Sequence, residues 1–147
     1  MLVDTNVLLY AANRDAPEHS IARRFLEERV TGGAGWHLTW SNIYEFLRVS
    51  THPRIFRRPL GAADAWGFIS ALCESPNLSV LQETERHGDV LAEIFRLVRG
   101  ASGNFIYDCR IAALMREHDV QEIATRDSDF RKFPFVRVID PFAPATP

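Results

Sequence analysis

The feature of this sequence that most restricts its fold is a regular alternation of short apolar runs with longer amphipathic segments. The expected strands cover Met1–Val3, Trp36–Trp40, Leu78–Leu81, Ile123–Thr125 and Val136–Ile139. Helical periodicity and capping residues predict helices over 17–30, 41–52, 62–73, 85–98 and from about 104 to 118. Strands that alternate with helices imply an α/β fold with a mostly parallel sheet flanked by helices.

Two of the expected helices have a clear apolar side. The residues expected to pack inward are Ile21, Phe25 and Leu26 in the first, and Trp66, Phe68, Ile69 and Leu72 in the other. With 147 residues, 46% of them hydrophobic, the chain is long enough for one domain over 1–147 with a real core, and its Pro-rich tail begins at about 141. The absence of a long linker also indicates a single domain.

Charge and cysteine content exclude several classes of protein. A net charge of −2 argues against binding nucleic acid by bulk attraction, so local positive groups and metal ions would have to hold it. Cys73 and Cys109 lack the spacing of a disulfide framework or a zinc site, and we expect both to be buried free thiols. No run approaches the roughly 20 apolar residues of a membrane span, and no secretory signal is visible. We therefore expect a cytoplasmic protein.

Acidic residues follow the expected strands or open the helices after them. Asp4 ends the first strand, and Asp127 and Asp129 follow the strand at 123–125. Glu45 comes four residues after Ser41, the expected helix cap, and Asp108 comes four residues after Asn104. In open parallel sheets, ligands bind beyond the carboxyl ends of the strands, and these acids would be aimed at that edge.

A cluster of this kind is suited to metal-assisted hydrolysis. Carboxylates that lie together repel each other, and a divalent cation such as Mg²⁺ or Mn²⁺ removes the repulsion. The ion can activate a water molecule and stabilise the leaving oxygen of a phosphodiester. Each acid taken alone also has a structural explanation, because Asp is common in turns and N-caps and acids are favoured in the first turn of a helix.

Four segments of the sequence resemble the motifs of the PIN-domain nucleases in order and spacing. They are Leu2–Leu9 with its Asp-Thr-Asn, Ser41–Arg48 with a central Glu, Asn104–Leu114 with an Asp before Ile-Ala-Ala, and Thr125–Phe130 with Thr-x-Asp-x-Asp-Phe. The stretch Thr51–Phe56, followed by Pro59-Leu60, is similar to one subgroup of the VapC toxins of bacterial toxin–antitoxin pairs. Cys109-Arg110 departs mildly from the pattern, since small residues are common there.

The resemblance implies a three-layer α/β/α PIN-like fold with a parallel sheet of about five strands. It also implies cleavage of RNA that depends on Mg²⁺ or Mn²⁺. Asp4, Glu45, Asp108 and Asp127 would be both the catalytic acids and the metal ligands. Asn6 and Thr125 would orient these carboxylates through hydrogen bonds, and Asp129 would either assist them or cap the next turn.

The same resemblance implies partners. They are an RNA substrate, such as tRNA or rRNA, a second copy of the chain in a homodimer, and a VapB-like antitoxin that blocks the site. Apolar surface for the protein partners would come from the helices at 17–30, 41–52 and 62–73. Trp40, Trp66 and Phe68 are candidates for this surface, although aromatic residues at such spacing more often belong to the core.

Basic residues near the expected site have two explanations. Arg48, His52, Arg54, Arg57 and Arg58 follow Glu45, and Arg126 lies between the residues of the fourth motif. They could follow an RNA backbone, or they could form a solvated surface loop.

Three other functions remain open from the sequence. A housekeeping PIN nuclease in RNA maturation would share the same chemistry. A phosphohydrolase could use Asp4 as its nucleophile, but such enzymes favour Asp-x-Asp after the first strand, and here Asn6 takes the second position. A non-catalytic binding module would be suggested by a missing acid, and none is missing.

Overall fold

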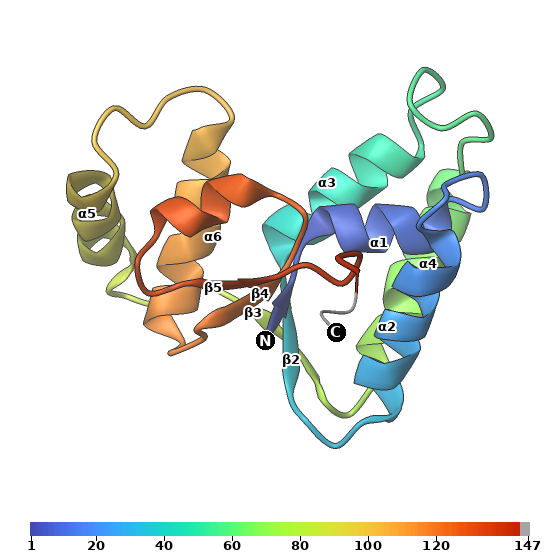
Figure 1. Ribbon diagram of the computed structural model, residues 1–147, viewed down its shortest axis with the longest axis horizontal. Coiled ribbons are helices and arrows are strands. Elements are labelled where there is room, and N and C mark those ends of the chain that lie inside the picture. The colour runs from blue at the N-terminus through green and yellow to red at the C-terminus, as the bar shows by residue number, and fades with distance from the viewer. Residues whose placement is uncertain (145–147) are drawn as a thin grey trace.

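The computed structural model describes residues 1–144 and contains one sheet of five parallel strands (Figure 1). The order in the sheet is β3-β2-β1-β4-β5, so the first strand of the chain lies at its centre. The strands are β1 Leu2–Val3, β2 Trp36–Thr39, β3 Leu78–Leu81, β4 Glu122–Ala124 and β5 Arg137–Ile139. The predicted α/β fold with a parallel sheet is confirmed.

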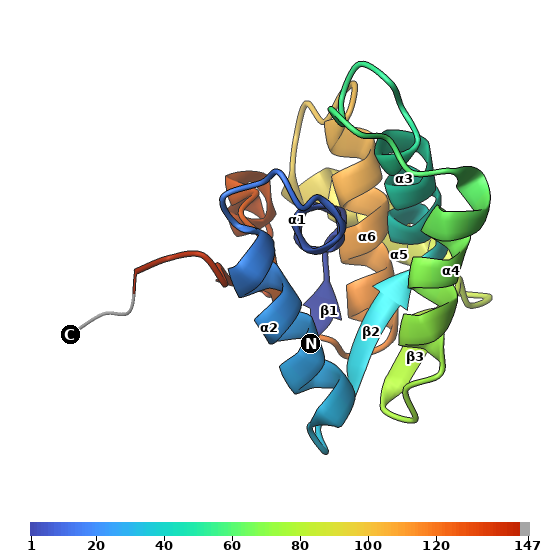
Figure 2. The same cartoon turned by 90° about the vertical axis from the view of Figure 1, so that its right-hand side faces the viewer.

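Within residues 1–144, six α-helices and one 3₁₀ helix, η1, cover the two faces of the sheet. The α-helices are α1 Thr5–Ala12, α2 His19–Thr31, α3 Trp40–Ser50, α4 Ala62–Cys73, α5 His87–Leu97 and α6 Phe105–Glu117, and η1 is Ser128–Lys132. Helices α1 to α4 lie on one side and α5 and α6 on the other (Figure 1). Figure 2 views the molecule from the first side, with α1 seen nearly end-on and α2 and α4 flanking it. The arrangement is the three-layer α/β/α fold that the sequence predicts.

Alternating side chains of the central strands pack into two separate hydrophobic cores, one on each face of the sheet. Leu2 and Ile123 point into the core beneath α5 and α6, which also contains Phe130 and Phe133. Val3 and Ala124 point into the core beneath α1 to α4. Because successive strand residues face opposite sides, both faces of the sheet must be apolar, and the short continuous apolar runs of the sequence meet this requirement.

Several helix details differ from the prediction. Helix α2 begins at His19 instead of Pro17, and Ile21 is 44% exposed, because Ala22 and Leu26 form its buried stripe. Trp66 of α4 is 47% exposed, whereas Phe68 stacks on Phe46 with ring centroids 5.1 Å apart. Buried Ala65, Ile69 and Leu72 set the rotation of α4 and leave the larger Trp66 outside.

The cysteine prediction is correct in one respect and wrong in the other. Cys73 and Cys109 are both free, and Cys109 is buried, but Cys73 is exposed. Cys73 is the last residue of α4, where the helix leaves the core. Within the described residues, no helix is long and apolar enough to cross a membrane. The last part of the expected Pro-rich tail, residues 145–147, lies outside the described residues.

Candidate active site

Asp4 lies at the carboxyl end of β1 and forms the N-cap of α1. Its backbone is extended, and its side-chain Oδ1 accepts a hydrogen bond of 2.7 Å from the backbone N–H of Thr5. The residue is only 7% exposed. The strand-to-helix turn therefore places a carboxylate inside the molecule at the edge where ligands of parallel sheets bind.

Three further side chains donate hydrogen bonds to this carboxylate. Thr125 Oγ1 and Asn6 Nδ2 lie 2.6 Å and 2.7 Å from Asp4 Oδ2. Asn42 Nδ2 lies 3.3 Å from Asp4 Oδ1. The partners come from the end of β4, the first turn of α1 and the first turn of α3. Asp4 thus joins three segments of the chain, and two of its hydrogen-bond partners are the predicted residues Asn6 and Thr125.

The environment of Asp4 disfavours its charge. Burial raises the pKa of Asp4 to about 6, and hydrogen bonds from Thr125 and Thr5 lower it again only in part. The carboxylates of Glu45 and Asp127 add to the rise because their negative charges face the same space.

Asp108 belongs to the same electrostatic group. It lies in the first turn of α6, as the sequence predicts, and is partly buried. Burial is the main factor that raises its pKa to about 7, and the repulsion of nearby carboxylates adds to this effect. These carboxylates are Asp127, Asp4, Asp129 and Glu45. Asp108 therefore lies within electrostatic reach of the other four predicted acids.

Glu45 is in α3, but its position in the helix differs from the prediction. The N-cap is Thr39 and not Ser41, because β2 ends one residue earlier and Trp40 already belongs to the helix. Glu45 consequently lies in the second turn and not the first. Its side chain is half exposed and is 3.9 Å from Arg48 on the same helix.

Asp127 and Asp129 flank the start of η1. Asp127 Oδ1 accepts a hydrogen bond of 2.8 Å from the backbone N–H of Asp129, so Asp127 is the cap of this turn. The backbone N–H of Asp127 donates to Thr125 Oγ1 at 2.9 Å. Asp129 forms an ion pair of 2.8 Å with Lys132, which partly neutralises its charge.

Asn42 and Thr39 are site residues that the sequence interpretation missed. Asn42 is 0% exposed and forms a capping box with Thr39 in addition to its contact with Asp4. A Thr-x-x-Asn sequence before a helix is the available signal, but a capping box normally has Glu or Gln at the fourth position. Ser41 was an equally acceptable cap by residue type, so the pattern did not distinguish the two.

Comparison with known proteins decides the family. The model of the PIN domain matches residues 1–136 of this chain. The chain is 34% identical to ribonuclease VapC37 of Mycobacterium tuberculosis over 136 residues, which cover 92% of this chain and 93% of the relative. It is 35% identical to ribonuclease VapC24 of the same species over 144 residues, or 95% and 94% of the two chains.

The chain belongs to the PIN-domain family, among the VapC-type members.

Solved structures show the same fold. VapC20 of Mycobacterium tuberculosis, described as a sarcin-ricin loop cleaving toxin, superposes with a TM-score of 0.64 and 22% identity and covers 92% of this chain and 95% of its own. VapBC2 from Rickettsia felis, bound to a DNA fragment from its promoter, gives a TM-score of 0.65 at 14% identity, with 94% and 96% of the chains covered. These PIN-like neighbours support the architecture of the sheet and its helices.

The side chains at the site of this PIN-domain chain are oxygen donors, which a hard divalent cation prefers. Among residues 1–144, no three His, Cys, Asp or Glu side chains converge closely enough to form a ready metal cage. Mg²⁺ usually binds through one or two carboxylates and keeps several waters, so it does not need such a cage. Asn6 Oδ1 is buried without a hydrogen-bond partner and offers an acceptor for a bound water beside Asp4. The carboxylates of Asp4 and Asp108, whose pKa is raised, and the spare acceptor of Asn6 therefore suit a hydrated ion.

The predicted RNA-binding arginines differ in what they contact. Arg58 pairs with Asp15, and Arg126 pairs with Glu18 at 2.6 Å. Arg48 has only the longer contact with Glu45. Among the described residues, Arg54 and Arg57 are exposed and form no ion pair. The basic loop therefore contains two arginines without an ion pair and one, Arg58, that is paired with Asp15.

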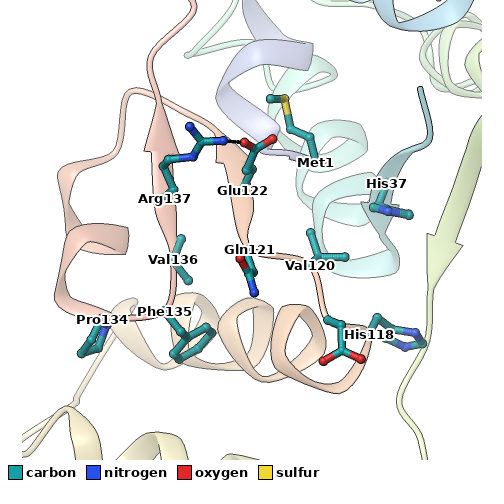
Figure 3. Close-up of a pocket in the computed structure, with 11 residues that line it drawn as sticks. Met1, His37, His118, Val120, Gln121, Glu122, Pro134, Phe135, Val136 and Arg137 are labelled. Atoms are coloured by element: carbon teal, nitrogen blue, oxygen red, sulfur yellow. Dashed lines mark ion pairs between the residues drawn. The ribbon is translucent and has the colours of Figure 1, made fainter. Parts of the chain in front are cut away.

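A cavity of the described chain lies away from this site. A cavity of about 520 Å³ opens at the amino end of the strands, next to Met1, Glu122 and Arg137 (Figure 3). Glu122 and Arg137 form an ion pair across its upper part, and His37 and His118 lie on one side of it (Figure 3). Because the acids follow the carboxyl ends of the strands, cavity and acids are at opposite edges of the sheet.

Proposed function

We propose that this chain is a toxin endoribonuclease of a VapBC-like pair, which cleaves RNA phosphodiester bonds with Mg²⁺ or Mn²⁺ held by Asp4, Glu45, Asp108 and Asp127. The observation that carries the proposal is the group of carboxylates at one sheet edge, in which burial and mutual repulsion raise the pKa of Asp4 to about 6 and of Asp108 to about 7. Such a group is more stable with a cation among its members. Full-length similarity to proteins named ribonucleases supports RNA as the substrate.

In this proposal the side chains have separate tasks. Asp4 is the fixed ligand, because four hydrogen bonds define the direction of its carboxylate. Glu45 and Asp108 approach from α3 and α6, and Asp127 approaches from the turn after β4. Asp129, which is tied to Lys132, supports that turn. When bound, the ion would lower the pKa of an attacking water and offset the charge on the leaving oxygen.

The partners belong to the same proposal. A VapB-like antitoxin is supported by the likeness to VapBC2, and exposed Trp40, Tyr44 and Trp66 supply apolar surface for protein partners, including a second copy of the chain. The RNA is expected to be structured, such as tRNA or rRNA, and to contact Arg54 and Arg57. A cytoplasmic location accords with the two free thiols.

The test is cleavage of a panel of structured RNAs, including tRNA and rRNA fragments, by purified protein in Mg²⁺, Mn²⁺ or EDTA. Wild type is compared with Asp4→Asn and with Glu28→Gln, a matched carboxylate-to-amide change at an exposed position of α2. We expect wild type and Glu28→Gln to cleave in either metal and Asp4→Asn to be inactive. Metal-independent cleavage, or full activity of Asp4→Asn, would contradict the proposal.

A further inference from the structure

The side chain of Asn42 is fully buried and uses both ends of its amide. Its Oδ1 accepts hydrogen bonds from the backbone N–H of Thr39 at 3.1 Å and from Thr39 Oγ1 at 2.7 Å. Its Nδ2 donates to Thr5 Oγ1 at 3.2 Å and to Asp4 Oδ1 at 3.3 Å. The oxygen of the amide therefore takes part in capping α3, and its nitrogen contacts Asp4 at the end of β1.

The two oxygens of Asp4 have different partners. Thr125 and Asn6 both donate to Oδ2. Oδ1 receives the backbone N–H of Thr5 and, among the described side chains, only the amide of Asn42. Without Asn42, the side-chain contacts of the carboxylate would all lie on one oxygen, and rotation about the bond to the carboxyl group would be less restricted.

The position of Asn42 also relates Asp4 to Glu45. Asn42 and Glu45 are three residues apart in α3, so they lie on the same side of the helix. A contact from Asn42 to Asp4 consequently fixes the helix that carries Glu45 relative to the strand that carries Asp4. One neutral side chain therefore sets the position of two acids from different segments relative to each other.

We propose that Asn42 is a positioning residue, which holds Asp4 and the Glu45 helix in the arrangement that binds the divalent cation. The proposal rests on the function proposed above. Groups that orient metal-binding carboxylates typically account for about 10- to 100-fold in metal affinity. We expect a loss in this range when the amide is removed.

The experiment measures Mn²⁺ binding to metal-free protein by isothermal titration calorimetry. Asn42→Ala removes both ends of the amide. Asn42→Ser keeps an oxygen that can accept from the backbone of Thr39 but is too short to reach Asp4. Asn77→Ser is the matched control, because it shortens another part-buried asparagine, whose amide donates to the carbonyl of Gly32 at the amino end of the strands, away from the acids. Circular dichroism and thermal unfolding establish that each variant is folded.

We expect both Asn42 variants to bind Mn²⁺ about 10- to 100-fold more weakly than wild type, and Asn77→Ser to bind within about 3-fold of it. If Asn42→Ala does not fold, Asn42→Ser decides. Unchanged affinity in folded Asn42→Ser, or an equal loss in Asn77→Ser, would overturn the positioning role and leave the proposed nuclease function standing. Absence of Mn²⁺ binding by wild type would instead overturn both.

Discussion

Thr125 Oγ1 lies 2.6 Å from Asp4 Oδ2, although the two residues are 121 positions apart in the sequence. The same hydroxyl oxygen accepts from Asn6 Nδ2 at 2.7 Å and from the backbone N–H of Asp127 at 2.9 Å. Strands β1 and β4 are paired, with Val3 beside Ala124, and this pairing brings the two residues that follow them together. One hydroxyl thus joins three parts of the candidate site.

Replacing Thr125 by Val should destabilise the protein by about 1–3 kcal/mol, because buried Asp4 loses one of its four donors and the part-buried N–H of Asp127 loses its acceptor. The measurement is urea unfolding in EDTA. Thr125→Ser keeps the hydroxyl and should retain most of the stability. A Thr125→Val protein as stable as wild type, or a Thr125→Ser protein that loses as much as Thr125→Val, would contradict the prediction.

The stability of the metal-free protein should decrease as pH rises from about 5 to 8. The pKa of Asp4 is raised from 3.8 to about 6 and that of Asp108 to about 7, so the folded state binds more protons than the unfolded chain between these values. Their contribution is present below the unfolded pKa and is lost as pH passes through the folded pKa. Thermal unfolding in EDTA at a series of pH values measures this decrease.

Two variants and a metal addition serve as controls for the pH series. Asp108→Asn should flatten the decrease, whereas Glu28→Gln, a change at an exposed position of α2, should leave it as in wild type. Saturating Mn²⁺ should abolish it under the proposed function, because the ion favours the charged carboxylates. A wild-type protein in EDTA that becomes more stable toward pH 8 would contradict the prediction.

Glu117 should contribute substantially to the attachment of α5 to α6. Its side chain is 1% exposed, accepts bonds of 2.7 Å from both the backbone N–H and the hydroxyl of Thr84, and pairs with His87. Burial tends to raise the pKa of Glu117, but the hydrogen bonds from Thr84 and His87 outweigh it and lower the pKa. Glu117→Gln should cost about 1–3 kcal/mol in urea unfolding at pH 7.

The difference between wild type and Glu117→Gln should shrink in acid. The stabilisation by a carboxylate with a lowered pKa is present above its unfolded value of 4.5 and is lost as pH falls through the folded value. Glu83→Gln removes an exposed pair with Arg110 and should cost no more than about 1 kcal/mol. A larger loss for Glu83 than for Glu117 would contradict this assignment.

Arg54 and Arg57 should contribute more to RNA binding than Arg58. The charge of Arg58 is already paired with Asp15, whereas within residues 1–144 the other two have no ion pair. Fluorescence anisotropy with the Asp4→Asn protein and a labelled RNA measures affinity without cleavage. Arg54→Ala or Arg57→Ala should each reduce the slope of log affinity against log salt by about 0.7 for a single-stranded contact, and Arg58→Ala should change it little.

The sequence was sufficient to predict the layers, the parallel sheet and the edge at which the acids gather, because these follow from local patterns. The strand at Leu78–Leu81 and the helix at Ala62–Cys73 have the predicted bounds. The predicted inward face of α2 was wrong at Ile21, which is exposed. The smaller Ala22 takes the buried position beside it. Local periodicity does not distinguish two adjacent apolar positions when one of them is alanine.

Contacts between distant parts of the chain could not be predicted in the same way. The role of Asn42 depends on where the end of β1 lies relative to α3, and the neutralisation of Arg126 depends on Glu18, which is 108 residues earlier. Neither contact produces a periodic pattern in the sequence from which it could be predicted. For the same reason, the carboxylates could be assigned to one edge, but the hydrogen bonds that distinguish Asp4 from the other acids could not.

The central position of β1 has a consequence for the cell that makes this protein. Asp4 is synthesised 121 residues before Thr125, whose hydroxyl it accepts a hydrogen bond from. A nascent chain that has completed α5 still lacks the strand that must pair with β1 on its second side. Under the proposed function, a nascent chain at that stage has an incomplete acidic site, and we expect it to be unable to cleave the RNA of the ribosome that makes it.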